Sequence, residues 1–81
     1  MKKKEQIFEQ VKSVLVERIG VEPESIQMGS KMNDDLGLDS LDRVELTIEL
    51  EREFDVTITD DEFESLVTIK DIVKYLKSKI K

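Results

Sequence analysis

Apolar residues recur at helical spacing in the first quarter of the chain. Between Lys4 and Ile19 they follow one another at steps of three and four, and Gly20 ends the pattern. This periodicity predicts an amphipathic helix over residues 4–19. Its apolar positions are Ile7, Val11, Val14, Leu15 and Ile19, with Phe8 and Val16 beside them.

The next segment, residues 20–39, is polar and contains turn-forming residues. It holds the only proline and the glycines Gly29 and Gly37, which predicts a loop of about twenty residues. A loop of that length in a small domain either is functional or is braced by its own side chains. The candidates for bracing are Val21, Ile26, Met32 and Leu36.

Helical patterns return in the second half of the chain. One helix is expected over residues 40–54, ending where the β-branched segment "DVTIT" begins, and a short turn is expected around residues 60–65. Thr68, with Asp71 three residues later, resembles a capping box and starts a last helix. Its apolar stripe consists of Ile69, Ile72, Val73, Leu76 and Ile80.

The helix over residues 40–54 has two apolar faces. At about 100° per residue, one face carries Leu46, Leu50 and Phe54, and the nearly opposite face carries Leu41, Val44 and Ile48. A stripe of acids separates them on one flank: Asp42, Glu45, Glu49 and Glu53. Either the second face is covered by the long loop or the last helix, or it is an exposed docking surface rimmed by acids.

Composition excludes several chemistries. The 81 residues include no cysteine, histidine or tryptophan. The chain therefore has no thiolate nucleophile, no serine–histidine–aspartate triad, no disulfide and no zinc site of the usual ligands. With 38% hydrophobic, 40% charged and 5% aromatic residues, it suits one small helical domain, residues 1–81, with an aliphatic core.

Charge is concentrated in the middle of the chain. Residues 33–64 contain thirteen acidic and two basic residues, a net charge of −11, whereas the whole chain carries −6. Such a field disfavours nucleic acid and anionic membranes and attracts basic protein partners. No apolar run approaches the roughly 20 residues of a membrane span, and the start lacks the apolar segment of a signal peptide, so we expect a cytoplasmic protein without membrane insertion.

Ser40 stands at the start of the two-faced helix. Serine at a helix start usually caps backbone N–H groups. If Asp39 takes the capping position instead, Ser40 becomes the first helical residue and its hydroxyl stays free and exposed. The N–H groups and dipole at that end of the helix would favour a phosphate.

The segment "DLGLDSLDRVELTIELEREFDVTI", residues 35–58, resembles the signature of acyl carrier proteins of the type II fatty-acid synthase kind. By this resemblance Ser40, flanked by Asp39 and Leu41, carries 4′-phosphopantetheine, derived from coenzyme A, through a phosphodiester. The thiol of that group would carry acyl intermediates as thioesters between enzymes, and the chain itself would catalyse nothing. Asp39 would also serve recognition by the modifying transferase.

The resemblance also implies a fold and partners. It predicts an all-α, small four-helix bundle of three longer helices and one short helix, with a long loop between the first two, acting as a monomer. The partners would be a phosphopantetheinyl transferase and acyl-processing enzymes with basic docking patches. The partner-facing residues would be Leu41, Asp42, Val44, Glu45, Ile48, Glu49 and Glu51.

A pocket for the acyl chain is also implied between the helices. Its lining would be Met32, Leu50, Ile58, Phe63, Leu66 and Ile72, although the same residues suit an ordinary core. Arg43, Arg52, Phe63 and Ile72 depart from the family pattern, because they add positive charge to the recognition helix or bulk to the pocket. Beside a role in fatty-acid or related acyl-chain biosynthesis, they leave room for a specialised carrier of another acyl, hydroxyacyl or aminoacyl group, and they predict weaker exchange with standard fatty-acid enzymes.

Three other functions fit the sequence less well. A calcium-binding loop fits poorly, because a frame from Asn33 puts Leu38 where glycine is needed, and a frame from Asp55 puts Asp60 there. A hydrolase built on Asp34 and Asp39 lacks a base that titrates near neutral pH. The third is an unmodified interaction module with the same fold, which the intact Asp39–Leu41 motif disfavours.

Overall fold

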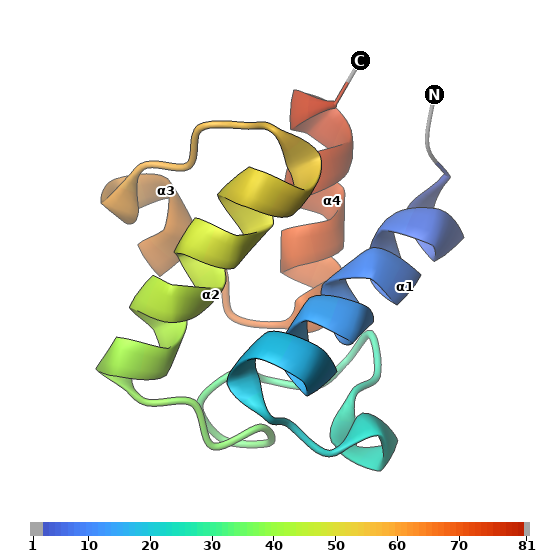
Figure 1. Ribbon diagram of the computed structural model, residues 1–81, viewed down its shortest axis with the longest axis vertical. Helices are drawn as coiled ribbons and strands as arrows, with labels where there is room; N and C mark the ends of the chain where they lie inside the picture. Colours follow the sequence, from blue (N-terminus) through green and yellow to red (C-terminus); the bar gives the residue numbers. More distant parts are fainter. Residues whose placement is uncertain (1–2, 81) are drawn as a thin grey trace.

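The computed structural model describes residues 3–80, so residues 1, 2 and 81 of the expected domain lie outside the described part. Within it the helices are α1 (Lys4–Val14), η1 (Leu15–Ile19), η2 (Pro23–Ser25), α2 (Ser40–Phe54), α3 (Asp60–Glu64) and α4 (Ile69–Lys79). Residues 3–80 form no strand; one isolated bridge joins Lys31 and Thr68. The predicted small helical bundle, with three longer helices and one short one, is confirmed (Figure 1).

The helix predicted over residues 4–19 is formed by α1 and η1 together. Its last turn widens into a π-helix, and the N–H groups of Gly20 and Val21 both donate to the Leu15 carbonyl, at 2.8 and 3.0 Å. Gly20 has a φ of 91°, a left-handed conformation that glycine adopts without steric cost. The helix therefore ends at the residue where the sequence pattern predicted its end.

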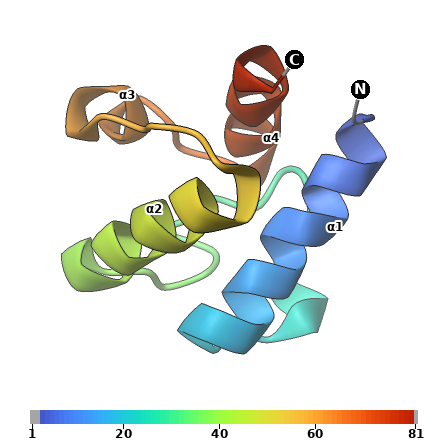
Figure 2. The ribbon, with the colours of Figure 1, turned by 45° about the horizontal axis from the view of Figure 1, so that its top comes forward.

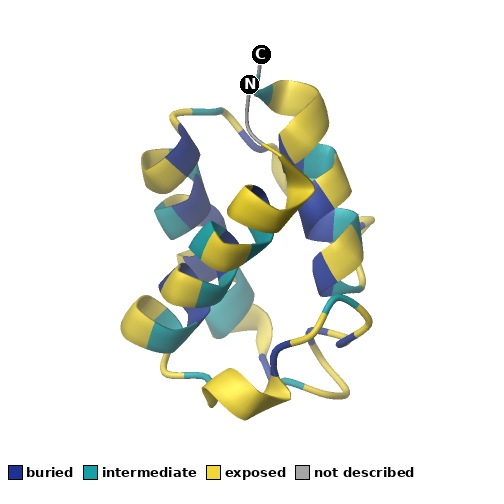
Figure 3. Cartoon of the chain, turned by 90° about the vertical axis from the view of Figure 1, so that its right-hand side faces the viewer, coloured by how far each residue is buried: buried dark blue, intermediate teal, exposed yellow. Residues whose placement is uncertain are grey.

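The core lies between the three longer helices. Figures 1 and 2 show α2 and α4 on the same side of α1, and α1 contacts both of them. Figure 3 shows buried and exposed bands alternating along the longer helices, as expected for amphipathic helices. The fully buried side chains are Ile7, Val11, Leu15, Met32, Leu46, Leu50, Ile69, Ile72, Val73 and Leu76.

The long loop is present over residues 20–39 and is interrupted only by η2. Ile26 and Met32 are buried, and Val21 and Leu36 pack partly against the core, so the loop is braced as predicted. The Ser30 hydroxyl accepts a hydrogen bond from the Gln27 N–H and donates to the Ser25 carbonyl, at 2.9 and 2.8 Å.

Hydrogen bonds also tie the loop to the residues around the start of α4. The Met32 N–H donates to the Val67 carbonyl at 2.9 Å, and the Ile69 N–H donates to the Ser30 carbonyl at 3.0 Å. The capping box predicted at the start of α4 is confirmed, because the Thr68 hydroxyl accepts from the Asp71 N–H at 3.1 Å.

The short helix α3 is attached to α4 through one carboxylate. Glu62 accepts a hydrogen bond from the Tyr75 hydroxyl at 3.0 Å and forms an ion pair with Lys79 at 3.5 Å. Hydrogen bonds from the backbone and hydroxyl of Thr59, with that of Tyr75, lower the pKa of Glu62. This side of α3 is thus held by polar contacts, and Phe63 is its only buried residue.

No helix within residues 3–80 combines the length and the apolar character needed to cross a membrane.

Candidate functional site

The start of α2 has the capping geometry that the sequence predicted. The Asp39 carboxylate accepts a hydrogen bond from the Asp42 N–H at 2.8 Å, and the Asp42 carboxylate accepts one from the Asp39 N–H at 3.4 Å. Ser40 is therefore the first helical residue, and it is exposed. Within the described residues its hydroxyl forms no hydrogen bond, so its oxygen is available to a reactant.

The two faces of α2 have different environments. Leu46 and Leu50 are fully buried, and Phe54 is 9% exposed. On the other face Leu41 is 67% exposed, Val44 58% and Ile48 43%. The interpretation in which the loop or the last helix covers this second face is wrong. The remaining interpretation, an exposed apolar face beside Ser40, fits the structure.

The acids along α2 have different contacts. Glu45 is exposed. Glu49 lies 3.8 Å from both Arg18 and Arg52, so part of its charge is neutralised. Glu51 accepts a hydrogen bond from the Ile58 N–H at 2.8 Å and thereby holds the segment that follows α2. Asp42 belongs to the cap, so Glu45 presents its charge to solvent more freely than the other three predicted acids.

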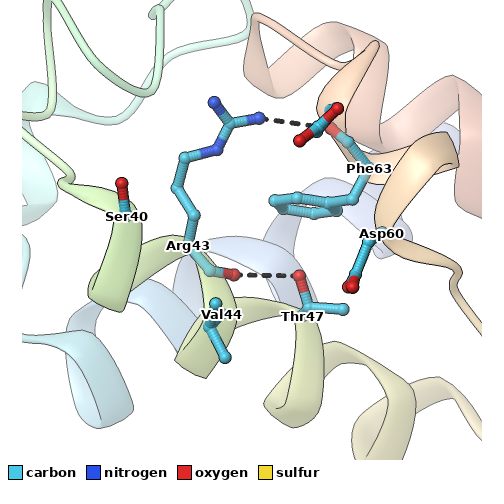
Figure 4. Close-up of a pocket in the computed structure, with 7 residues that line it drawn as sticks. Ser40, Arg43, Val44, Thr47, Asp60 and Phe63 are labelled. Carbon is cyan, nitrogen blue, oxygen red and sulfur yellow. Dashed lines mark hydrogen bonds between the residues drawn. The ribbon is translucent and has the colours of Figure 1, made fainter.

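A hollow of about 290 Å³ lies beside Ser40, between α2 and α3 (Figure 4). Figure 4 shows the Arg43 side chain extending from α2 towards Phe63, across the space between Ser40 and that ring. The Thr47 hydroxyl donates to the Arg43 carbonyl at 2.8 Å. The lining consists of Ser40, Arg43, Val44, Thr47, Asp60, Phe63 and Glu64.

Arg43 has a role that the sequence did not reveal. One of its terminal nitrogens, Nη2, donates to the carbonyls of Phe63 and Leu66, each at 3.2 Å. The central carbon of its guanidinium group lies 5.4 Å from the centroid of the Phe63 ring, within the range of a cation–π contact. Arg43 is therefore half-buried and joins α2 to the end of α3. The sequence interpretation, a charge added to the recognition surface, missed these contacts.

The six predicted pocket residues all lie in the core. Each is at most 8% exposed: Met32, Leu50, Ile58, Phe63, Leu66 and Ile72. Phe63 also lines the hollow beside Ser40. Leu66 lines a second hollow of about 140 Å³, with Lys31, Asn33, Asp34, Arg43, Glu64 and Val67.

The geometry at Ser40 suits a phosphodiester. The N–H groups in the first turn of a helix have no helical partners, and Asp39 takes only that of Asp42. The residues present therefore offer an exposed hydroxyl next to backbone donors and the positive end of a fifteen-residue helix.

Comparison with known proteins gives consistent matches. A family model described as "Phosphopantetheine attachment site" matches residues 9–76. The acyl carrier protein of Campylobacter concisus (strain 13826) is 48% identical over 71 residues, which cover 88% of this chain and 92% of the relative. That of Campylobacter fetus subsp. fetus (strain 82-40) is 49% identical over 70 residues, which cover 86% of this chain and 91% of the relative. That of Campylobacter hominis is 45% identical over 73 residues, covering 90% and 92%.

Proposed function

Because the chain belongs to the acyl carrier protein family, whose members bear 4′-phosphopantetheine and are not enzymes, we propose that Ser40 is the attachment residue. The observation that carries this proposal is the position of its hydroxyl. Ser40 is the first residue of α2, exposed, and relieved of capping by Asp39. It lies inside the matched region, in the Asp-Ser-Leu motif formed with Leu41.

When bound, the prosthetic group supplies the thiol that this chain lacks, on which acyl groups are carried as thioesters. The residues of the chain position and present that group. Asp39 keeps the Ser40 hydroxyl free by capping the helix itself, and the N–H groups of the first turn of α2 stabilise the phosphodiester charge. The rigid core behind α2, with Leu46 and Leu50 fully buried, fixes the attachment point.

Acyl carrier proteins interact with a phosphopantetheinyl transferase and with acyl-processing enzymes. In this chain the exposed face of Leu41, Val44 and Ile48 is the proposed contact surface for both. Glu45 and the net charge of −11 over residues 33–64 would orient basic patches on these enzymes towards it. Asp42, Glu49 and Glu51 contribute to the field but are engaged in contacts within the chain.

The pathway proposed is fatty-acid or related acyl-chain biosynthesis in the cytoplasm, with the carrier acting as a monomer. A specialised cargo, such as a hydroxyacyl or aminoacyl group, is supported by the lining of the hollow beside Ser40. That lining includes a guanidinium group, a hydroxyl group and two carboxylates, from Arg43, Thr47, Asp60 and Glu64. The six core residues named above would have to move apart to admit a long apolar chain.

Intact mass spectrometry tests the attachment. The protein is incubated with coenzyme A and a broad-specificity phosphopantetheinyl transferase, together with Ser40→Ala and the matched variant Ser25→Ala, which removes another exposed serine hydroxyl. Wild type and Ser25→Ala are expected to gain one phosphopantetheine, and Ser40→Ala none. No gain in wild type would instead support an unmodified interaction module.

A further inference from the structure

The contact between Arg43 and α3 separates two hollows. The larger hollow begins at Ser40, and the smaller one reaches Leu66; Arg43 and Glu64 line both. Arg43 is three residues after Ser40 on α2, so the two side chains lie on the same side of that helix, one turn apart. An acyl chain that passes from Ser40 towards the core between α2 and α3 therefore meets Arg43 first.

Several contacts hold Arg43 across this path. Nη2 donates to two carbonyls, those of Phe63 and Leu66, and the guanidinium group stands over the Phe63 ring. The Phe63 carbonyl lies in the last turn of the five-residue helix α3 and also accepts from the Leu66 N–H at 3.0 Å. The Leu66 carbonyl lies two residues after the end of that helix, beyond its helical donors. Without Arg43, the Leu66 carbonyl would have to find a water molecule in its place.

The attachment of α3 depends strongly on this arginine. The helix is short, and Phe63 is its only buried residue. Its Glu62 carboxylate also forms a hydrogen bond with Tyr75 and an ion pair with Lys79, both on α4. Arg43 supplies the hydrogen bonds between the side chains of α2 and the backbone at the end of α3. Releasing it would free α3 to move away from α2 and join the two hollows.

We propose that Arg43 is a specificity-determining residue that keeps the space between α2 and α3 closed and so admits only acyl chains long enough to offset its contacts. This inference rests on attachment of the prosthetic group at Ser40. Each methylene that leaves water favours insertion, whereas the cost of releasing Arg43 is paid once. Short or polar cargo therefore stays in the outer hollow beside Ser40. Because of Arg43, the shortest acyl chain that inserts between α2 and α3 is longer than it would be without the contacts of this arginine.

The test compares chain-length dependence in wild type and Arg43→Met, which keeps an unbranched side chain but removes the donors and the charge. Both proteins are loaded with acetyl, hexanoyl, octanoyl or dodecanoyl phosphopantetheine, and cleavage of the thioester by hydroxylamine is timed. Arg52→Met is the matched control, because it removes an arginine from the same helix whose ion pair, among residues 3–80, is with Glu49.

Protection of the thioester is expected to begin at a shorter chain in Arg43→Met than in wild type and Arg52→Met. For the shortest chain that is protected in Arg43→Met, cleavage of the thioester should be about fivefold slower in Arg43→Met than in wild type. This is the factor that corresponds to the net free energy of one hydrogen bond. The acetyl form should be cleaved equally in all three proteins. The same onset in all three would overturn the inference while leaving Ser40 as the attachment site. Failure of wild type to load would overturn both.

A second measurement locates the chain directly and does not depend on the methionine variant. When wild type carries the longest acyl chain that it leaves unprotected from hydroxylamine, the backbone amide NMR signals of Val44 and Thr47 should move, with those of Leu66 and Ile72 unmoved. In Arg43→Lys, which keeps the charge but loses the planar donor group, the changes should extend to Leu66 and Ile72. Changes at Ile72 of equal size in wild type would contradict the closed arrangement.

Discussion

The Asp39 carboxylate accepts a hydrogen bond from the Asp42 N–H at 2.8 Å, so the residue between the loop and α2 performs the capping that serines usually provide. This one contact explains why the neighbouring serine hydroxyl is available. It also links the stability of α2 to the presentation of Ser40, because the same carboxylate fixes the first turn of the helix.

Two substitutions of Asp39 separate the effect of its capping hydrogen bond on stability from the effect of its charge on modification. Asp39→Ala is expected to lower the free energy of unfolding by about 1 kcal/mol, because the cap is lost, whereas Asp39→Asn should change it little. Urea unfolding followed by circular dichroism measures both. If the Asp39 charge serves recognition, as the family resemblance implies, Asp39→Asn should nevertheless be modified more slowly by the transferase. Equal stability of Asp39→Ala and wild type would contradict the capping role.

The two faces of α2 should respond differently to the same substitution. Leu46→Ala removes a fully buried side chain and should cost about 2–5 kcal/mol of stability. Leu41→Ala removes one that is 67% exposed and should change stability by less than about 0.5 kcal/mol, while slowing transfer of phosphopantetheine. Thermal melts measure the stability of both variants, and a mass-spectrometric time course measures the rate of phosphopantetheine transfer. A Leu41→Ala protein that is modified at the wild-type rate would argue against this face as the docking surface.

Salt should act on folding and on partner binding with opposite signs. The acidic side chains of residues 33–64, with a net charge of −11, repel one another in the folded chain. Added salt screens this repulsion and should therefore raise the melting temperature. The same screening should slow association with a basic transferase, seen as a lower rate at limiting protein concentration. A melting temperature that is independent of ionic strength would show that this repulsion is not significant.

The cap of α4 predicts a pH-dependent difference between two proteins. Hydrogen bonds from the Thr68 and Val67 N–H groups lower the pKa of Asp71, so folding favours its ionised form. The resulting stability is fully present above the ordinary pKa of 3.8 and is lost as the pH falls through the lowered pKa of Asp71. The free energy of unfolding of wild type should therefore exceed that of Asp71→Asn by about 0.5 kcal/mol at neutral pH, and this difference should disappear at low pH.

Urea unfolding at several pH values measures this gap, with Asp34→Asn as the control for an exposed acid. The control should show no comparable gap at neutral pH. A gap for Asp71→Asn that stays constant down to the lowest pH would mean that the carboxylate charge does not contribute.

The helices could be predicted because single residues mark their ends. Gly20 has the left-handed backbone that stops the first helix, and Asp39 and Thr68 carry the side-chain acceptors that begin α2 and α4. These signals are local, so they can be read without knowing the fold. The β-branched residues 56–59 form no strand, because no neighbouring segment pairs with them in the described chain.

The role of Arg43 could not be predicted in the same way. Its acceptors lie twenty and twenty-three residues along the chain, in the short helix α3 and just after it, and the place of α3 beside α2 is set by tertiary packing. Glu51 illustrates the same limit: the family resemblance implies a place among the partner-facing residues, and it does not reveal the hydrogen bond that Glu51 accepts from the Ile58 N–H, seven residues later. Sequence spacing identified which face of α2 each residue occupies, but not what lies opposite it.

The most direct test of Ser40 as the attachment residue is to locate the modification within the chain. Trypsin cleaves after Lys31 and Arg43 and releases residues 32–43, in which Ser40 is the only residue with a hydroxyl group. After incubation with coenzyme A and the transferase, this peptide alone should gain the mass of one phosphopantetheine. The same gain on any other peptide, or on none, would contradict the assignment of Ser40 as the attachment site.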